Sequence, residues 1–294
     1  MLKFIRAFTR AKHISPIEIK EDEIEKELFN VERGTHLLLG KFTEIDIYEA
    51  IEKAGLINEL QKKGLYPVEI IIDHESILKQ KIYIDLKEES AKPKRIAEII
   101  IGECKYRLNE KVLAISLKKT EIECVVVEWL VLQNVKSAFT EEFPRLPGQR
   151  YPGLRMGRFV LKLLEDIALA THKDCFIAFP EFYHNAAIYI DYLHFLNPET
   201  EGRVLKMRND LKSLPLADVS FAFCGGCIIE RKNSEERKLS WEAEEMIYPL
   251  SEELKFYFSS SEYKAIKEKA YNSHSYQLDK LCYELKQEEL LTKF

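Results

Sequence analysis

The segment from residue 145 to residue 162, RLPGQRYPGLRMGRFVLK, carries the residue types that bind phosphate groups. It contains five basic residues and three glycines, and no acidic residue lies between Glu142 and Glu165. Glycines let backbone N–H groups approach a ligand closely, and guanidinium groups pair with phosphate oxygens. A helix beginning near Gly157 would add the partial positive charge of its N-terminus. The segment therefore predicts an anion site suited to phosphate. The alternative is a surface loop whose arginines are solvated or pair with the acidic stretches of the chain.

Neither of two familiar phosphate motifs is present in this segment. The P-loop GxxxxGK[ST] fails because Gly153 is followed by Leu154 and Arg155, and the dinucleotide motif GxGxxG does not occur. The segment instead resembles the acyl-CoA pyrophosphate loop of the GNAT acetyltransferase superfamily, Gln/Arg-x-x-Gly-x-Gly/Ala, which lies between a central strand and a long helix. Arg150 and Gly153 match its first and middle positions, whereas Arg155 stands at the last small position and Pro152 removes one backbone donor.

A second stretch, residues 183–195 (YHNAAIYIDYLHF), resembles the helix that follows the next strand in this family. That helix carries Asn, small residues and Tyr and ends in Gly-Phe. Asn185 begins the matching Asn-Ala-Ala-Ile core, and His194 stands at the glycine position. Asn185 would hold the pantetheine arm or simply cap the helix. The resemblance covers about residues 34–198 and implies acetyl-CoA, or another acyl-CoA, as co-substrate. The residues expected to bind it are Arg150, Gly153, Leu154, Arg155, Gly157, Arg158 and Asn185.

The resemblance also implies a catalytic strand. In the family, the strand before the loop lines the acyl-CoA cleft, and an acidic group there often deprotonates the amine. By position this strand is residues 123–133, ECVVVEWLVLQ. Alternation places Glu128 on one face with Val126, Leu130 and Leu132, so burial would raise the pKa of Glu128 toward the range of a general base. The alternative is a Glu at the sheet edge or paired with an arginine.

Two tyrosines are candidates for the acid that protonates the departing CoA thiolate, as the family's helix tyrosine does. They are Tyr189 and Tyr192, and each is alternatively a packing residue of an amphipathic helix. His184 and His194 could move protons, although a histidine near an aromatic cluster is usually structural.

Six cysteines are too sparse for a disulfide scaffold and indicate a reducing cytoplasm. The Cys224-Gly-Gly-Cys227 spacing could hold a metal or serve redox chemistry, but zinc needs a second ligand pair and none is evident. Residues 219–229 (VSFAFCGGCII) instead predict a β-hairpin with the glycines as its turn and the cysteines facing each other. We therefore expect no metal.

Hydrophobic periodicity predicts the elements that position these residues. Residues 157–171 follow the 3.6-residue period of a helix closely, and residues 175–179 form a short buried strand. The order of elements predicts an α+β or α/β fold, with a GNAT-like central mixed, mostly antiparallel β-sheet flanked by helices and a C-terminal α+β extension. Further strands are predicted at 36–42, 68–73, 81–86, 96–106 and 112–117, and a central strand is predicted at 123–133. Further helices are predicted at 46–63, 185–192, 200–214, 252–257 and 261–286. Gly55 predicts a break in the first of these helices.

Three regions follow from this order. Residues 1–33 predict an amphipathic helix, docked on the body or lying on a membrane surface, and an acidic connector. Residues 34–198 predict the acyl-CoA-binding domain. Residues 199–294 predict an extension with a β-hairpin and helices, through which a homodimer could form.

Composition narrows the class of protein. With 294 residues, 46% apolar and 32% charged, the chain has the composition of a soluble globular protein. Its net charge of −5 argues against a nucleic-acid binder with a basic surface. No apolar run approaches the roughly 20 residues of a membrane span, so we expect no transmembrane segment. Residues 1–13 are basic without a sustained apolar core, so we expect a cytoplasmic protein without a signal peptide.

These observations predict an acyl-CoA-dependent N-acyltransferase that transfers an acetyl or other acyl group to a primary amine on a small molecule or peptide. The alternative is a GNAT-like fold that has lost catalysis and serves as a CoA-binding or regulatory module, which the departures at Arg155 and His194 favour.

Overall fold

The computed structural model describes most of the chain from Leu37 onward. The predicted N-terminal helix and acidic connector, residues 1–33, lie outside the described residues. The described residues are 37–73, 79–88, 93–109, 112, 115, 117–233 and 235–294.

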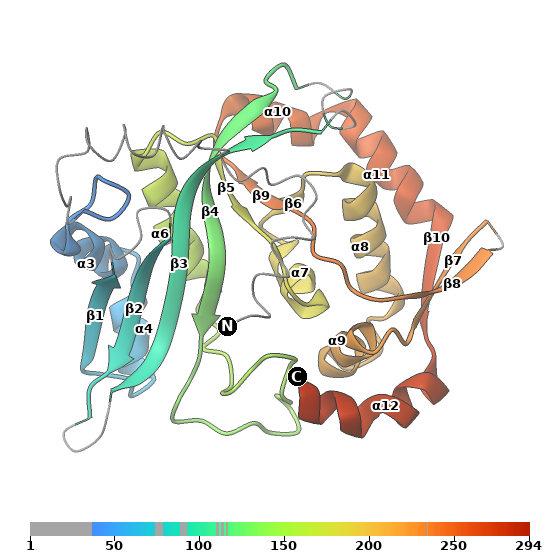
Figure 1. The fold of residues 1–294 in the computed structure, drawn as a ribbon, viewed down its shortest axis with the longest axis horizontal. Helices are drawn as coiled ribbons and strands as arrows, with labels where there is room; N and C mark the ends of the chain where they lie inside the picture. The colour runs from blue at the N-terminus through green and yellow to red at the C-terminus, as the bar shows by residue number, and fades with distance from the viewer. Residues whose placement is uncertain are drawn as a thin grey trace, which may run out of the picture.

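A seven-stranded sheet runs through the centre of the molecule (Figure 1). Its strand order is β1-β2-β3-β4-β5-β9-β6; β4 and β5 pair in parallel, and the other neighbours pair antiparallel. The prediction of a mixed, mostly antiparallel sheet flanked by helices is confirmed, with 123–133 near its centre. The strands are β1 (Val68–Asp73), β2 (Gln80–Leu86), β3 (Lys94–Arg107), β4 (Glu121–Leu132), β5 (Cys175–Ala178), β6 (His194–Phe195) and β9 (Met246–Pro249).

Helices on the N-terminal side begin where the sequence provides start signals. Helix α3 (Glu44–Lys53) starts at a capping box in which Thr43 and Asp46 exchange hydrogen bonds. Helix α4 (Leu56–Lys62) starts after Gly55, whose φ of 84° is readily adopted by glycine. The predicted break at Gly55 is therefore confirmed.

Helix α6 (Gly157–Ala170) joins β4 to β5 and confirms the strongest helix prediction. Its apolar stripe, represented by Val160 and Leu164, is buried in the larger hydrophobic cluster together with Val125 of β4. A smaller cluster contains Cys124 and Ile177. Because Cys124 and Val125 are neighbours on one strand, the two clusters lie on opposite faces of the sheet.

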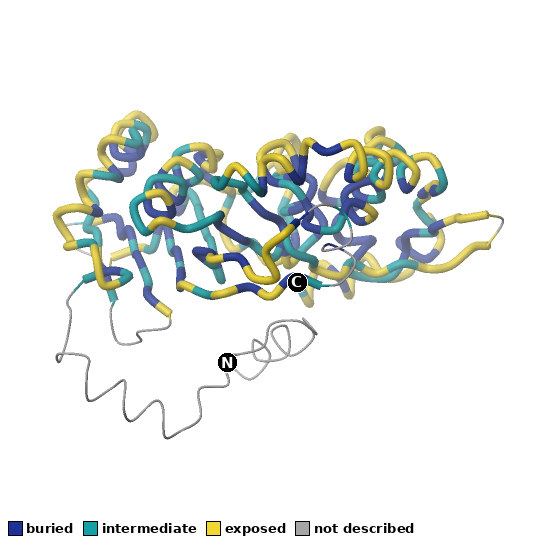
Figure 2. Tube along the Cα trace, turned by 90° about the horizontal axis from the view of Figure 1, so that it is seen from above, coloured by how far each residue is buried: buried dark blue, intermediate teal, exposed yellow. Residues whose placement is uncertain are grey.

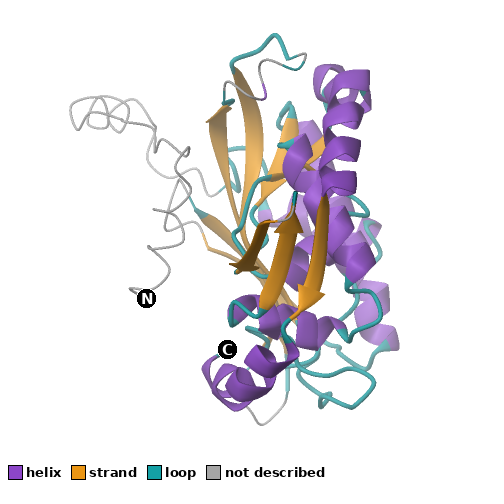
Figure 3. Ribbon diagram, turned by 90° about the vertical axis from the view of Figure 1, so that its right-hand side faces the viewer, coloured by secondary structure: helices purple, strands orange, loops and turns teal. Residues whose placement is uncertain are grey.

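The C-terminal half is mainly helical and is joined to the same sheet, because β9 pairs with β5 (Figure 3). A second sheet, in the order β10-β7-β8, lies beside it, and the exposed β7–β8 hairpin projects from the body (Figure 2). The elements are α7 (Tyr183–Tyr189), α8 (Pro198–Asp210), α9 (Leu216–Cys224), β7 (Ile228–Lys232), β8 (Glu235–Leu239), α10 (Glu252–Ser259), α11 (Ser261–Ser273), β10 (His274–Leu278) and α12 (Lys280–Lys293).

The predicted hairpin at 219–229 is wrong. Residues up to Cys224 belong to helix α9, and the hairpin lies later, between β7 and β8. Residues 219–223 are all buried, and a short run buried on every side has neither the helical nor the strand period. The glycines end the helix instead: Gly226 has a φ of 64°, and the N–H of Cys227 donates to the carbonyl of Ala222 at 2.8 Å.

Other boundaries also differ from the sequence predictions. The predicted helix 261–286 is interrupted by β10, which pairs with the distant β7. The helix predicted at 185–192 ends at Tyr189. Among the described residues of the predicted strand 36–42, Leu38 and Phe42 form an isolated bridge around a turn. In the predicted strand 112–117, the described residues Val112, Ile115 and Leu117 lie outside any strand.

Candidate functional site

The candidate site lies where β4 and β5 separate. Residues 124–127 of β4 pair in parallel with residues 175–178 of β5, after which β5 ends and β4 continues to Leu132. The carbonyl of Leu132 accepts a hydrogen bond from Leu154 on the side away from β3. Backbone groups two residues apart point to the same side of a strand, so the N–H and C=O of Leu130 also face that side. No strand of the described residues pairs with Leu130 there, so an extended ligand could bond to this edge.

The loop before α6 returns to β4 just beyond this edge. The N–H of Asn134 donates to the carbonyl of Pro152 at 2.7 Å, and Gln133 forms an isolated bridge with Gly153. The N–H of Leu154 donates to Leu132 at 3.1 Å. These bonds hold the arginine-rich segment at the carboxyl end of β4.

Buried and exposed residues alternate along this segment. Leu154 and Met156 are 3% and 1% exposed and anchor it in the core, whereas Arg155 and Gly157 are exposed. Arg155 adopts a φ of 58°, and its guanidinium lies 3.6 Å from the centre of the Phe143 ring. A cation over an aromatic face is favourable, which gives the exposed arginine one preferred orientation.

Three arginines of this segment remain available for an anion. Arg150, Arg155 and Arg158 are exposed, and no carboxylate among the described residues forms an ion pair with any of them. Helix α6, which begins here, has no acidic residue in its first turn and no side-chain cap. We call Arg150, Arg155 and Arg158 the arginine site. Arg158 nevertheless has an acidic neighbour: Lys62, together with a smaller contribution from the charge of Arg158, lowers the pKa of the Glu59 carboxyl on α4.

The other two basic residues of the segment have structural partners. Arg145 donates to the carbonyl of Gln149 at 3.0 Å and to that of Leu291 at 3.1 Å. Lys162 pairs with Glu165 and Asp166 at 3.1 and 2.9 Å.

Glu128 occupies a β-bulge at the point where the two strands separate. Ile101 pairs with Val127 and Ile100 pairs with Trp129, which leaves Glu128 as the extra residue. Bulges bend a strand and redirect side chains, and they occur often beside active sites.

The bulge overturns the prediction that Val126, Glu128, Leu130 and Leu132 share one face. Val126 packs on the smaller cluster, whereas Leu130 and Leu132 pack on the larger one. The Glu128 side chain is 15% exposed, and its carboxylate lies 2.7 Å from the ammonium of Lys79. The alternative of a paired Glu128 therefore holds, with a lysine as partner.

Helix α7 lies against the loop that carries the arginine site. A Cβ added to Gly148, whose φ is 79°, would lie 2.8 Å from the Phe182 ring, so the loop contacts the residue that precedes α7. Asn185 and Tyr189 of α7 are half-buried, and burial raises the pKa of the Tyr189 hydroxyl. Tyr192 lies beyond the end of the helix and is 53% exposed.

The arginine site, the open edge of β4 and helix α7 together suit an extended anionic ligand. Comparisons with protein-family models, curated proteins and solved structures found no match to this chain. In the part of the chain that the structure describes, no group of three His, Cys, Asp or Glu side chains could hold a metal ion. No helix in that part is long and apolar enough to cross a membrane.

His184, a possible proton shuttle by sequence, is buried and structural. Its Nδ1 lies 2.8 Å from the hydroxyl of Ser220, and the ring stacks on Phe182. Burial lowers the pKa of His184 to about 4, so the ring is neutral at pH 7.

We expect His184 to make stability depend on pH. Between pH 6.5 and about 4 the unfolded state binds a proton that the folded state does not, so stability falls as the pH falls through this window. Each pH unit lowers the folding equilibrium constant by up to about tenfold. Urea unfolding of His184→Gln should lose this slope. The control is exposed His172→Asn, which should keep it; a slope unchanged in His184→Gln contradicts the prediction.

A network around Glu201 is one group of polar residues that the sequence analysis missed. Glu201 is 3% exposed, and its carboxylate accepts hydrogen bonds from the backbone N–H of Phe195 at 2.9 Å and the Tyr263 hydroxyl at 2.8 Å. Its other oxygen lies 3.3 Å from both Lys267 Nζ and His194 Nδ1. The carboxyl fixes the ring of His194, whose side chain is 41% exposed. The sequence predicted a helix at 200–214, but no signal distinguished Glu201 from the other charged residues of that helix.

Proposed function

We propose that the chain is an acyl-CoA-dependent N-acyltransferase. This proposal rests on the arginine site: three exposed arginines that form no ion pair with a carboxylate among the described residues, in the segment that follows the carboxyl end of β4 and its open edge at Leu130. CoA combines a pyrophosphate with an amide-containing pantetheine arm. The arginines match the first, and the backbone N–H and C=O of Leu130 match the second.

The proposed reaction uses groups at the point where β4 and β5 separate. A primary amine attacks the thioester carbon, the C–S bond breaks, and the acyl group passes to nitrogen. Glu128, directly or through a water, accepts the proton that the amine loses. Tyr189, or the exposed Tyr192, supplies a proton to the CoA thiolate; the raised pKa of Tyr189 keeps it protonated at neutral pH.

A specific contact favours a second candidate, a CoA-binding module without catalysis. The Glu128 carboxylate already has Lys79 at 2.7 Å, and an ion-paired carboxylate is a weaker base. Under this proposal the arginine site binds CoA and no acyl group is transferred.

Isothermal titration with acetyl-CoA tests both candidates. Heat of binding together with CoA release in the presence of a panel of amines supports the acyltransferase. Binding without turnover supports the second candidate. Absence of heat at millimolar acetyl-CoA rejects both.

Substitution of the arginines should weaken this binding. We expect Arg150→Ala and Arg158→Ala each to raise the dissociation constant for acetyl-CoA about tenfold, the effect of one hydrogen bond to a charged group. The matched control is Arg107→Ala, an exposed arginine on β3 whose backbone lies opposite Glu121, at the other end of β4. If Arg150→Ala, Arg158→Ala and the control all bind acetyl-CoA with the affinity of the wild type, the phosphates bind elsewhere on the protein.

A further inference from the structure

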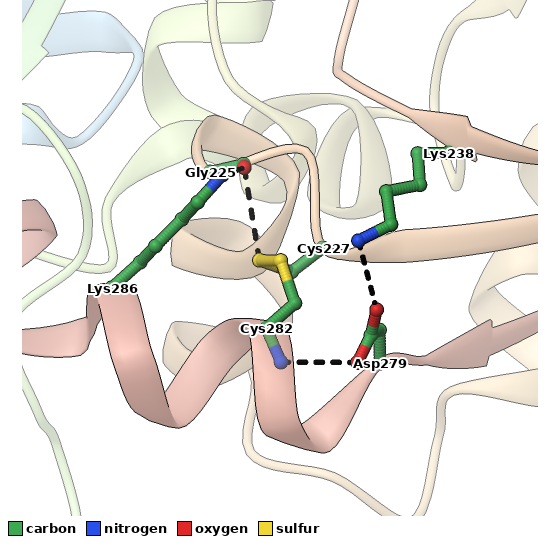
Figure 4. The surroundings of a disulfide bond; sticks show 6 residues. All are labelled: Gly225, Cys227, Lys238, Asp279, Cys282 and Lys286. Carbon is green, nitrogen blue, oxygen red and sulfur yellow. Dashed lines mark hydrogen bonds and ion pairs between the residues drawn. A yellow bond between two sulfur atoms is a disulfide. The ribbon is translucent and has the colours of Figure 1, made fainter.

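A disulfide anchors the start of helix α12. Cys227 and Cys282 form this bond, which ties the first turn of α12 to the chain just before β7 (Figure 4). The expectation of free cysteines is therefore wrong for this pair, and Cys227 does not face Cys224 across a hairpin. Cys224 is instead a free, half-buried thiol at the end of α9.

Polar contacts strengthen this anchor. The carboxylate of Asp279 accepts a hydrogen bond from the backbone N–H of Cys282 at 3.0 Å and pairs with Lys238 at 3.1 Å. Lys286 donates to the carbonyl of Gly225 at 2.8 Å. These contacts fix the first half of a helix of 14 residues. Because a helix is rigid along its axis, they also fix the direction in which α12 runs to its last turn, about 20 Å away.

The last turn of α12 contacts the loop that precedes the arginine site (Figure 1). The N–H of Gly148 donates to the carbonyl of Phe294 at 2.9 Å, and Arg145 donates to the carbonyl of Leu291 at 3.1 Å. The Phe294 ring lies edge to face with Phe182, with ring centres 6.2 Å apart, and the Phe182 ring lies against Gly148. The helix therefore meets the loop through both backbone and ring contacts.

A closed turn connects these contacts to Arg150. The N–H of Gln149 donates to the carbonyl of Leu146 at 3.1 Å, and the Gln149 side chain accepts from the N–H of Leu146 at 3.2 Å. The Arg145 guanidinium donates to the carbonyl of Gln149 at 3.0 Å. Arg150 is the next residue, so the position of this turn determines where the Arg150 side chain starts.

We propose that α12 positions Arg150 within the arginine site and that Phe294 and Arg145 are the positioning residues. Helix α12 belongs to residues 199–294, so this C-terminal part of the chain contributes to the anion site although it carries none of the three arginines. The hold of α12 on the loop stands on the contacts above. The role of Arg150 in binding an anion rests on the proposed function.

The other two arginines of the site have supports of their own. Arg155 follows Leu154, whose N–H is bonded to β4, and its guanidinium lies over the Phe143 ring. Arg158 belongs to the first turn of α6. A change in the last turn of α12 should therefore act mainly on Arg150.

Amide hydrogen exchange in the full chain measures the hold of α12 on the loop. Phe294→Ala removes the ring contact with Phe182 and should speed exchange at Gly148 about fivefold, the effect of one aromatic pair. The N–H of Leu154 is the internal control and should keep its rate, and Leu285→Ala, at a side chain 78% exposed on α12, is the matched variant. Unchanged exchange at Gly148, or equal acceleration at Leu154, overturns the proposal.

A double-mutant cycle with acetyl-CoA tests whether α12 acts through Arg150. We expect Phe294→Ala to raise the dissociation constant about fivefold in the wild-type chain and to have little further effect in Arg150→Ala. The same substitution should keep its effect in Arg158→Ala. Phe294→Tyr, which retains the ring, should bind acetyl-CoA more tightly than Phe294→Ala. Equal effects of Phe294→Ala in the Arg150→Ala and Arg158→Ala backgrounds overturn the positioning of Arg150.

Arg145→Lys separates position from charge. Lysine keeps the positive charge but lacks the planar fork that reaches the carbonyls of both Gln149 and Leu291. We therefore expect severalfold weaker acetyl-CoA binding by this variant. An affinity equal to that of the wild type overturns the role of Arg145.

The positioning and the proposed function can fail separately. Faster exchange at Gly148 in Phe294→Ala, with no acetyl-CoA binding by the wild type, rejects the proposed function and leaves the hold of α12 on the loop standing. Acetyl-CoA binding by the wild type, with additive effects of Phe294→Ala and Arg150→Ala, supports the proposed function and overturns the positioning.

Discussion

Replacing Gly202 with alanine is expected to lower the free energy of unfolding by about 3 kcal/mol or more. Gly202 lies on α8 where this helix crosses α11. An added Cβ would overlap the backbone carbonyl oxygen of Lys267, and it would lie 2.9 Å from the Cβ of Ala270 and 3.0 Å from the backbone nitrogen of Tyr271. Backbone atoms of a packed helix cannot turn away as a side chain can, so the helices must separate. Alanine is otherwise the better helix former by about 1 kcal/mol, so a loss of stability reports the crowding.

Urea unfolding measures this effect, with Gly157→Ala as the matched helical control. A Cβ at Gly157 would meet no atom within 4 Å, so that variant should be as stable as the wild type or slightly more stable. Adding Ala270→Gly should not restore Gly202→Ala, because the carbonyl of Lys267 remains in place. Full restoration, or a loss below about 1 kcal/mol in Gly202→Ala alone, would show that the helices adjust easily.

Elements with a clear local pattern could be predicted from the sequence. Helix α6 has a continuous apolar stripe, and Gly55 marks the break between α3 and α4. The consecutive strands β1 to β3 are rich in Ile and separated by polar residues, so their antiparallel pairing followed from order alone. The sequence likewise showed that no acidic residue lies between Glu142 and Glu165, so no acidic neighbour within the segment neutralises its arginines.

Elements that depend on distant partners could not be predicted. Strand β10 spans His274–Leu278 within a sequence of helical character, and its pairing with β7 across more than forty residues defines it. Cys227 forms a disulfide with Cys282, which is 55 residues away in the sequence. Residues 219–223 of helix α9 are all buried, so this part of the sequence lacks a period that distinguishes helix from strand.

The geometry of the candidate site could not be predicted for the same physical reason: it depends on parts of the chain that are distant in sequence. A bulge inserts one residue and exchanges the two faces of a strand from that point onward, so strict alternation misplaced Leu130 and Leu132 relative to Val126. The partner of Glu128 comes from Lys79, just before β2, and this strand is not the direct neighbour of β4. Neither the bulge nor the Lys79 partner of Glu128 can be read from the hydrophobic periodicity of the sequence.

Glu201→Gln is expected to lower the free energy of unfolding by about 3 kcal/mol at pH 7. The carboxylate is 3% exposed and faces four donors: the N–H of Phe195, the hydroxyl of Tyr263, Lys267 Nζ and His194 Nδ1. Glutamine has nearly the same shape, but its NH₂ group would face two of these donors. The loss is near the lower end for a broken buried pair, because Lys267 and His194 are partly exposed and can be solvated.

The effect of this substitution should depend on pH. Burial alone would raise the pKa of Glu201, but His194, Tyr263 and Lys267 outweigh burial and hold it below the ordinary 4.5. A carboxyl with a lowered folded-state pKa contributes stability that is complete above the unfolded pKa and is lost as the pH falls through the folded pKa. The difference between wild type and Glu201→Gln should therefore shrink as the pH falls below 4.5.

Urea unfolding at pH 7 and at pH 3.5 measures both parts of this expectation. The control is Glu199→Gln on the same helix: Glu199 is half exposed, lies 3.9 Å from Lys232, and should change stability by less than about 0.5 kcal/mol. An equal loss in Glu201→Gln at both pH values would mean that shape and packing, rather than the buried charge, hold α8 to α11. A smaller loss at pH 3.5 than at pH 7 identifies the ionised carboxylate as the group that joins α8, α11 and β6, and thereby fixes His194 at the end of the sheet.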